Sequence, residues 1–177
     1  LNGFKALYKG DVASEVYTKL GQKDYASEIA QIRASGADAV YFFLPGGMGI
    51  SFLKQYSGSG VAIPVIGPAF SFDQGILQAV GAAALGVRNT SQWNKDIDTP
   101  TNQAFVNSFL AEHERLPSLY ASQGFGTANL LLSAMDTASV SDNAGFRTAL
   151  KDANFTSVRG DFKFGSNNHP IHDVYIR

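Results

Sequence analysis

The chain has 177 residues, of which 45% are hydrophobic and 16% are charged, so it can bury a core and form one domain or two small ones. Its net charge of -1, from 14 basic and 15 acidic residues that are interspersed, gives no electrostatic footprint for nucleic acid or an anionic membrane surface. The sequence shows no bilayer-spanning apolar run and no signal peptide at its start. The absence of cysteine excludes disulfides and thiolate metal sites, and it leaves the cellular compartment open.

Both ends of the sequence are typical of a fragment. The segment 1–7 begins in what looks like the last turn of a helix, without Met and without a cap. The segment 175–177 stops inside a strand-like run. We therefore expect a longer parent protein.

The first half of the chain alternates between strand-like and helix-like segments. We expect strands at 11–17, 39–44, 62–66 and 85–90. We expect helices at 24–35, 47–58 and 73–80, with Asp24 and Asp73 as N-caps and with Ile29 and Ile32 pointing inward. This succession predicts an α/β fold with a parallel sheet, helices on both faces and right-handed crossovers. Phe42 and Phe43 are assigned to the sheet core.

The second half has a different pattern. Helices are expected at 101–114, 119–138 and 142–153, the last capped by Asp142, and a terminal hairpin is expected from 160–164 and 171–176. The polar stretch 89–100, with one Trp and one Pro, is the best candidate for a crossing between two lobes. We accordingly divide the chain into segments 1–91 and 92–177.

The segment 41–60 is the most informative one for function. A run of large apolar residues ends at Leu44, Pro45-Gly46-Gly47 breaks it, and an amphipathic helix pattern follows. Ligands of open α/β sheets lie above such strand ends, where loops and helix N-termini converge. None of the side chains in this turn can act as a nucleophile or a redox group, so the pattern favours binding over catalysis.

Several stretches together resemble one family. They are 17–34, 38–43, the glycine-rich turn, Pro64-Val-Ile-Gly-Pro68, and Tyr120 ahead of a helix. In order and spacing they are similar to the type I periplasmic solute-binding proteins of the branched-chain amino acid (Leu/Ile/Val) ABC transporter class. The resemblance covers essentially the whole chain and corresponds to the C-terminal half of such a protein. It implies parallel doubly wound sheets in two lobes, with 92–177 completing the first lobe and the N-terminal lobe largely absent.

The resemblance also implies a function. Such a protein is a periplasmic, exported receptor that binds a small molecule between its lobes, closes by hinge rotation and is read by the membrane permease of an ABC importer. It is not an enzyme and needs no cofactor. The missing N-terminal lobe would belong to the same protein or to a separate chain.

By position, the resemblance assigns ligand-binding and hinge residues. The contact loop of the second lobe corresponds to Pro45, Gly46, Gly47 and Met48. A second contact corresponds to Ala69 and Phe70, and Tyr120 corresponds to an aromatic residue that closes over the ligand. Ser91 and Trp93 would lie near the hinge. We expect Met48, Phe70 and Tyr120 to face a shared hollow.

One departure from the family pattern bears on the ligand. Members that bind amino acids place an acidic residue after the Gly-Pro turn, to pair with the ligand's ammonium, and this chain has Ala69 there. An ammonium without a counter-charge would be costly to enclose. Phe70, Phe72 and Met48 suit an apolar or aromatic body, so we expect an aromatic-acid-binding member with a small hydrophobic or aromatic carboxylate as ligand.

Other interpretations remain open at this point. One of Phe70 and Phe72 can cover the following helix instead, and Tyr120 can be a packed aromatic at a helix start. A ligand-sensing domain of a regulator or receptor would share the fold, and a nucleotide-dependent α/β enzyme is a weaker alternative. The segment 124–129 only approximates a dinucleotide fingerprint within a helical pattern, and His169 and His172 lack further metal ligands except Asp173. We predict no catalytic or metal-binding residues.

Overall fold

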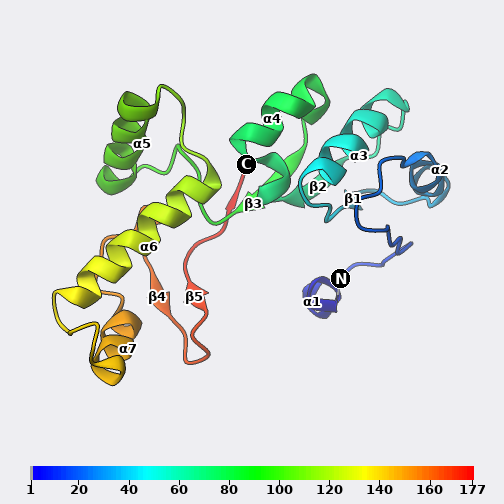
Figure 1. Ribbon diagram of the computed structural model, residues 1–177. Coiled ribbons are helices and arrows are strands. Elements are labelled where there is room, and N and C mark those ends of the chain that lie inside the picture. The colour runs from blue at the N-terminus through cyan, green and yellow to red at the C-terminus, as the bar shows by residue number, and fades with distance from the viewer. Residues whose placement is uncertain (1) are drawn as a thin grey trace.

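The computed structural model of the chain describes residues 2–177 (Figure 1). Its α-helices are α1 (Asn2–Leu7), α2 (Ala26–Ala34), α3 (Gly47–Gly58), α4 (Gln74–Val80), α5 (Pro100–His113), α6 (Leu119–Met135) and α7 (Asn143–Asp152). Short 3-10 helices are η1 (Ala69–Phe72) and η2 (Gly81–Ala84). The strands are β1 (Val40–Tyr41), β2 (Val65–Pro68), β3 (Arg88–Ser91), β4 (Lys163–Phe164), β5 (Pro170–Ile171) and β6 (Tyr175–Ile176).

The main sheet has the strand order β1-β2-β3-β6. Its first three strands are parallel, as the alternation of strands and helices predicted, with Tyr41 opposite Ile66 and Ile66 opposite Arg88. Strand β6 is antiparallel to β3 and places Tyr175 opposite Ser91. Strands β4 and β5 form a separate antiparallel hairpin.

Two parts of the molecule are visible in Figure 1, joined by β3 and β6. On the right, α1 to α4 lie with β1 and β2, and we call these elements with β3 and β6 the sheet part. On the left, α5 to α7 lie with the β4–β5 hairpin, and we call these the helical part. The chain crosses between the parts on β3 and returns on β6. The division at residue 91 stays a prediction.

The core of the sheet part lies between helix α3 and the sheet. Helix α3 buries one face, and α2 adds Ile29, with Ile32 packed beside it, as expected from the sequence. The ring of Phe52 lies 5.3 Å from that of Phe42 and 5.7 Å from that of Tyr25. The buried members of this cluster are Tyr25, Ile29, Phe42, Leu44, Met48, Phe52, Leu53, Tyr56, Val65, Phe72 and Val80.

A second, smaller cluster lies where the helical part meets the crossing. Its buried members are Ala69, Trp93, Phe105, Leu119 and Val158. Ala69 comes from the sheet part, so this cluster joins the two parts. Helices α5 and α6 begin as the sequence patterns indicate, because the side chains of Thr99 and Ser118 accept N–H groups of their first turns.

The N-terminal strand that we expected at 11–17 is not present. This segment has no regular secondary structure, and β1 is the edge of the sheet within residues 2–177. An extended segment needs a neighbouring strand for its backbone hydrogen bonds, and residues 2–177 offer none there. The short helix at the chain start is present as α1, and its Phe4 ring stacks on Tyr41 at 4.9 Å.

The assignment of Phe43 to the core was wrong for this chain. Phe42 is buried, whereas the side chain of Phe43 is 62% exposed. Successive residues of a strand point to opposite faces of a sheet, and the helices α2 and α3 cover the face of Phe42. Only one of the two rings can therefore enter that core.

The remaining differences concern strand ends. Expected strands 39–44, 62–66 and 85–90 become the shorter or shifted β1, β2 and β3, and the expected hairpin strand 171–176 is split. Its start pairs with β4, and its end joins β3 in the main sheet. Among residues 2–177, every helix is too short or too polar to traverse a lipid bilayer.

Candidate ligand-binding site

Two glycines determine the shape of the loop after β1. Gly46 has φ 52° and ψ −124°, a conformation open to glycine, and α3 begins at the next residue. Gly49 approaches the end of the strand closely, since a Cβ there would lie 2.9 Å from the carbonyl oxygen of Leu44. Pro45 and Gly47 are exposed at this loop, as a contact role requires.

The turn after β2 is held against this loop. The buried hydroxyl of Ser71 in η1 donates a hydrogen bond of 2.9 Å to the carbonyl oxygen of Leu44. Because this bond joins residues 27 positions apart, the ends of the two parallel strands form one unit. The sequence analysis did not identify Ser71, although a small polar residue between two aromatics was visible there.

Phe70 lies half-buried on this turn and contacts Phe43. The two rings meet edge to face, with centroids 4.9 Å apart and an interplanar angle of 80°. Phe72, its neighbour, is buried in the core against Phe42. The structure therefore separates the two candidates, and Phe70 is the one available to a ligand.

Met48 and Ala69 lie behind this surface. The side chain of Met48 is buried in the core, and its sulfur accepts a hydrogen bond from the N–H of Gly21 at 3.4 Å. Ala69 is buried in the cluster that joins the two parts. Neither side chain shares an open hollow with Phe70, which differs from our expectation for Met48.

Tyr120 lies in the first turn of α6, and its side chain is 57% exposed. The residue before it, Leu119, is buried, and its backbone N–H donates to the Asp73 carboxylate at 2.8 Å. The sequence pattern assigned Asp73 as the cap of its own helix, α4, but its side chain makes no such bond. It holds the start of α6 instead.

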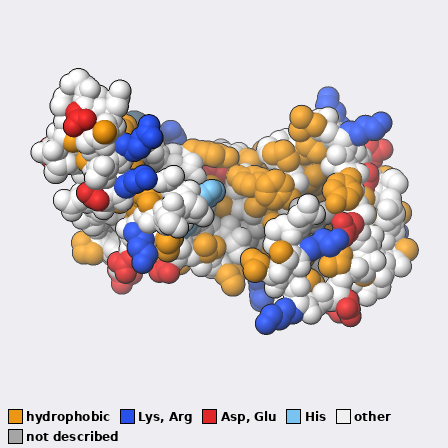
Figure 2. All heavy atoms as spheres, turned by 90° about the horizontal axis from the view of Figure 1, so that it is seen from below, with side chains coloured by type: hydrophobic (Ala, Val, Ile, Leu, Met, Phe, Trp, Pro, Cys, Tyr) orange, Lys and Arg blue, Asp and Glu red, His pale blue; other side chains and the backbone are white. Residues whose placement is uncertain are grey.

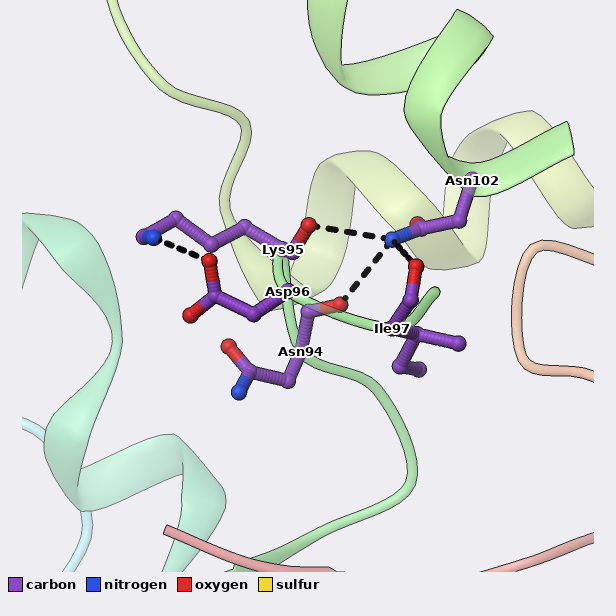
Figure 3. Close-up of polar contacts among 5 residues, drawn as sticks. All are labelled: Asn94, Lys95, Asp96, Ile97 and Asn102. Atoms are coloured by element: carbon purple, nitrogen blue, oxygen red, sulfur yellow. Dashed lines mark hydrogen bonds and ion pairs between the residues drawn. The ribbon is translucent and has the colours of Figure 1, made fainter. Parts of the chain in front are cut away.

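The residues predicted near the hinge are buried and hydrogen-bonded. The Ser91 hydroxyl donates to the carbonyl oxygen of Trp93 at 2.6 Å. The Trp93 indole N–H donates to Asn102 Oδ1 at 2.7 Å. The amide nitrogen of Asn102 contacts three carbonyl oxygens, those of Asn94, Lys95 and Ile97, at 3.0 to 3.2 Å (Figure 3). The segment after β3 is thus fixed to α5. Any rotation of the helical part against the sheet part would therefore have to occur before Trp93.

Arg177 supports the same region from β6. Its Nε donates to Asn89 Oδ1 at 2.7 Å, and an Nη atom lies 3.4 Å from the carbonyl oxygens of both Ala69 and Phe72. Burial lowers the pKa of Arg177, while the nearby Asp73 carboxylate acts in the opposite direction. A hollow of about 290 Å³ lies here, lined by residues that include Asp73, Trp93 and Arg177. None of the predicted contact residues lines it.

The chemistry of the two strand ends is apolar. Residues 44–48 and 69–72 carry no charged side chain, and their one hydroxyl, Ser71, is buried and paired. Residues 2–177 contain no group of three or more His, Cys, Asp or Glu side chains placed to hold a metal ion. The arrangement can present backbone groups and aromatic edges to an apolar molecule.

The comparison with known families decides the class of protein. The family described as periplasmic binding protein matches residues 2–177. The chain belongs to this family. Among curated relatives, a Leu/Ile/Val-binding protein homolog from Brucella melitensis is 28% identical over 189 residues, which cover 99% of this chain and 48% of the relative. The chain spans about half the length of the curated relatives it matches.

Solved structures agree on a type I periplasmic binding protein fold. An ABC transporter solute-binding protein from R. palustris, in complex with benzoate, has 31% identity and a TM-score of 0.92, and the match covers 100% of this chain and 50% of that one. One from Rhodopseudomonas palustris HaA2, with p-hydroxybenzoic acid, has 25% identity, a TM-score of 0.87 and coverage of 99% and 50%. A leucine-binding protein from Thermotoga maritima, at 20% identity and a TM-score of 0.86 over 99% and 50%, supports the fold alone.

Proposed function

We propose that this periplasmic binding protein is the C-terminal half of an extracytoplasmic receptor of an ABC importer. It binds a small hydrophobic or aromatic carboxylate between two lobes, closes on it by hinge rotation, and releases it unchanged to a membrane permease. It acts in the periplasm and is not an enzyme. The relatives support this role, since they are named as solute-binding proteins of ABC transporters.

The observation that carries the ligand class is the apolar character of the two strand ends. No charged side chain lies within 44–48 or 69–72, and the nearest carboxylate after them, Asp73, accepts the Leu119 N–H. A ligand ammonium enclosed here would lack a counter-charge, at a cost of several kcal/mol. The benzoate and p-hydroxybenzoic acid in two related structures agree with this argument.

The proposed contacts follow from exposure. Pro45, Gly46 and Gly47 offer backbone groups, Phe70 offers a ring face, and Tyr120 closes from α6. Met48 and Ala69 support this wall from behind, and Ala69 stands where amino-acid-binding members place an acidic residue. Ser91, at the end of β3, is the proposed hinge position, and Trp93 anchors its far side.

The carboxylate group of the ligand is held by the N-terminal lobe, which this chain does not include. Figure 2, a view from below, shows hydrophobic side chains on the right-hand part of the molecule and toward its middle. The exposed ones of the sheet part include Tyr41, Phe43 and Ile66. An apolar surface of this kind marks a contact region, which we assign to the missing lobe.

A thermal-shift series on the full-length protein tests the ligand class. Benzoate and 4-hydroxybenzoate should raise the melting temperature in proportion to RT ln(1 + [L]/Kd), and leucine and isoleucine at equal concentration should not. A shift with the branched-chain amino acids alone would overturn the argument from Ala69. Chemical conversion of the ligand, followed by chromatography, would overturn the receptor function in favour of an enzyme.

A substitution locates the site. Phe70→Ala should weaken benzoate binding by about 1 to 3 kcal/mol, because a buried aromatic contact is lost. Isothermal calorimetry measures the change. The matched control is Phe155→Ala, which removes another half-buried ring that lies 5.3 Å from that of Phe162 in the helical part and should leave the affinity unchanged. Equal affinity for Phe70→Ala and wild type would place the ligand elsewhere.

A further inference from the structure

Asp73 makes a direct side-chain link between the two parts of the molecule. It precedes α4 in the sheet part, and its Oδ1 accepts the N–H of Leu119, the first residue of α6, at 2.8 Å. These residues are 46 positions apart. The carboxylate could have capped α4, yet its side chain makes no bond there. The Asp73 carboxylate therefore accepts its hydrogen bond from the helical part and not from its own helix.

The bond completes the N-terminus of α6. The first N–H groups of a helix have no partner within it, and the Ser118 hydroxyl accepts only that of Ala121. Asp73 supplies the acceptor for Leu119 from outside the helix. A carboxylate at this position is also favoured by the helix dipole. Leu119 itself is buried in the cluster that joins the two parts, so its N–H would otherwise lose water without gaining a partner.

The position of this bond relates it to ligand binding. Asp73 ends the turn that carries Phe70, and Leu119 directly precedes Tyr120. These are the side chains proposed to meet the ligand from the two parts. We propose that Asp73 is a positioning residue, which fixes the start of α6 beside the Phe70 turn and so sets the distance between the two aromatic contacts. This inference rests on the proposed function of a two-lobed receptor.

The surroundings of Asp73 are fixed on both sides. Arg177, which follows β6, donates from an Nη atom to the carbonyl oxygens of Ala69 and Phe72 at 3.4 Å, so the turn is tied to the end of the returning strand. On the other side, Trp93 packs in the same cluster as Leu119 and is bonded to Asn102. Strands β3 and β6 connect the two parts through the backbone, whereas the Asp73 bond limits where α6 can lie. Loss of the bond leaves the connection but removes this limit.

The test uses full-length protein and separates the bond from the packing. Asp73→Ala removes the acceptor, and Asp73→Asn keeps an oxygen at the same place. Leu119→Pro removes the donor at a first helical position, where proline is tolerated, and Ser118, at ψ 169°, is already in the extended conformation that precedes proline. Leu119→Ala keeps the N–H and loses the side chain, so it controls for packing.

Two readouts are needed. Benzoate affinity should fall about tenfold in Asp73→Ala and in Leu119→Pro relative to Leu119→Ala, and should change by less than about threefold in Asp73→Asn. Distances between spin labels at Lys54→Cys on α3 and Lys151→Cys on α7, in full-length protein with any cysteine outside residues 1–177 replaced, should broaden in the first two variants only. The double variant Asp73→Ala/Leu119→Pro should be no weaker than the worse single one.

Additive losses in the double variant, or unchanged label distances in Asp73→Ala, would overturn the positioning role. If wild-type protein does not bind benzoate, the proposed ligand class is wrong, and the label distances of the ligand-free variants alone decide the inference. If benzoate binds normally to Asp73→Ala, the receptor function stands and the inference fails. The two failures are thus distinguishable.

Discussion

The sheet part buries a larger core than the helical part. Eleven buried residues form one cluster around α3, against five in the cluster that includes Trp93 and Phe105. Helix α7 buries none of its residues, and α6 leaves Leu132 and Met135 more than half exposed. The two parts therefore differ in how far this chain alone can stabilise them.

This difference indicates separate roles. The strand ends that carry Pro45 and Phe70 rest on the larger core, so their geometry is set mainly by this chain. The uncovered face of α6 needs an apolar partner, which the proposed N-terminal lobe supplies. In the proposed receptor, the strand ends form one rigid wall of the binding site, and the N-terminal lobe completes the part that contains α6. This arrangement is consistent with closure around a ligand.

Two substitutions test whether the sheet part and the helical part differ in the stability of their cores. Phe52→Ala should lower the free energy of unfolding by about 3 to 5 kcal/mol, because a ring buried between Tyr25, Phe42 and Tyr56 is replaced by a cavity. Leu132→Ala in the same chain should change it by less than about 0.5 kcal/mol, since its side chain is 58% exposed. Urea unfolding measures both.

The same pair in full-length protein sharpens the result. If the N-terminal lobe covers α6, the cost of Leu132→Ala should rise toward about 2 kcal/mol while that of Phe52→Ala stays the same. A Leu132→Ala cost that is equal in the short and the long protein would mean that α6 remains uncovered. The proposed lobe contact would then be wrong.

The crossing between the parts has a smaller expected effect. Asn102→Ala should lower the free energy of unfolding by about 2 to 3 kcal/mol, because the carbonyl oxygens of the 94–97 segment and the Trp93 indole lose their partner. The emission of Trp93, the one tryptophan in the chain, should shift to longer wavelength. Asn94→Ala is the matched control, since Figure 3 shows its side chain turned away from Asn102.

An unshifted Trp93 emission in Asn102→Ala would show that packing alone holds the indole. The anchoring role that we give to this segment would then fall to Phe105, whose ring lies 6.0 Å from the indole.

The sequence predicted the elements well where periodicity is local. Helices α2, α3, α5 and α7 follow from apolar spacing and, for α7, from the Asp142 cap, whose bond lies within a few residues. The parallel orientation of β1, β2 and β3 also followed, because helices connect these strands along the chain.

The failures arose where distant residues decide the outcome. Asp73 has the sequence pattern of an N-cap, but the N–H that it accepts comes from Leu119. Met48 lies next to a glycine turn that faces outward, yet helix periodicity turns its side chain into the core. Phe42 and Phe43 were both assigned to the core, but strand alternation places them on opposite faces and the helices cover only the face of Phe42.

The smallest expected effect concerns the loop with Gly46 and Gly47, which forms part of the wall of the proposed site. Gly46→Ala should lower the free energy of unfolding by about 1 to 2 kcal/mol, because φ 52° with ψ −124° strains any residue with a Cβ. Gly47→Ala, one position along, has no positive φ and no atom within 4 Å of the added Cβ, so stability should be kept or slightly raised. The two variants add the same methyl group to adjacent positions of one loop, of which Gly46 is half-buried and Gly47 exposed. If both weaken benzoate binding and only Gly46→Ala unfolds more easily, the loop both contacts the ligand and depends on glycine for its shape. Equal stability of the two variants would show that the loop can relax, and the wall would not be rigid.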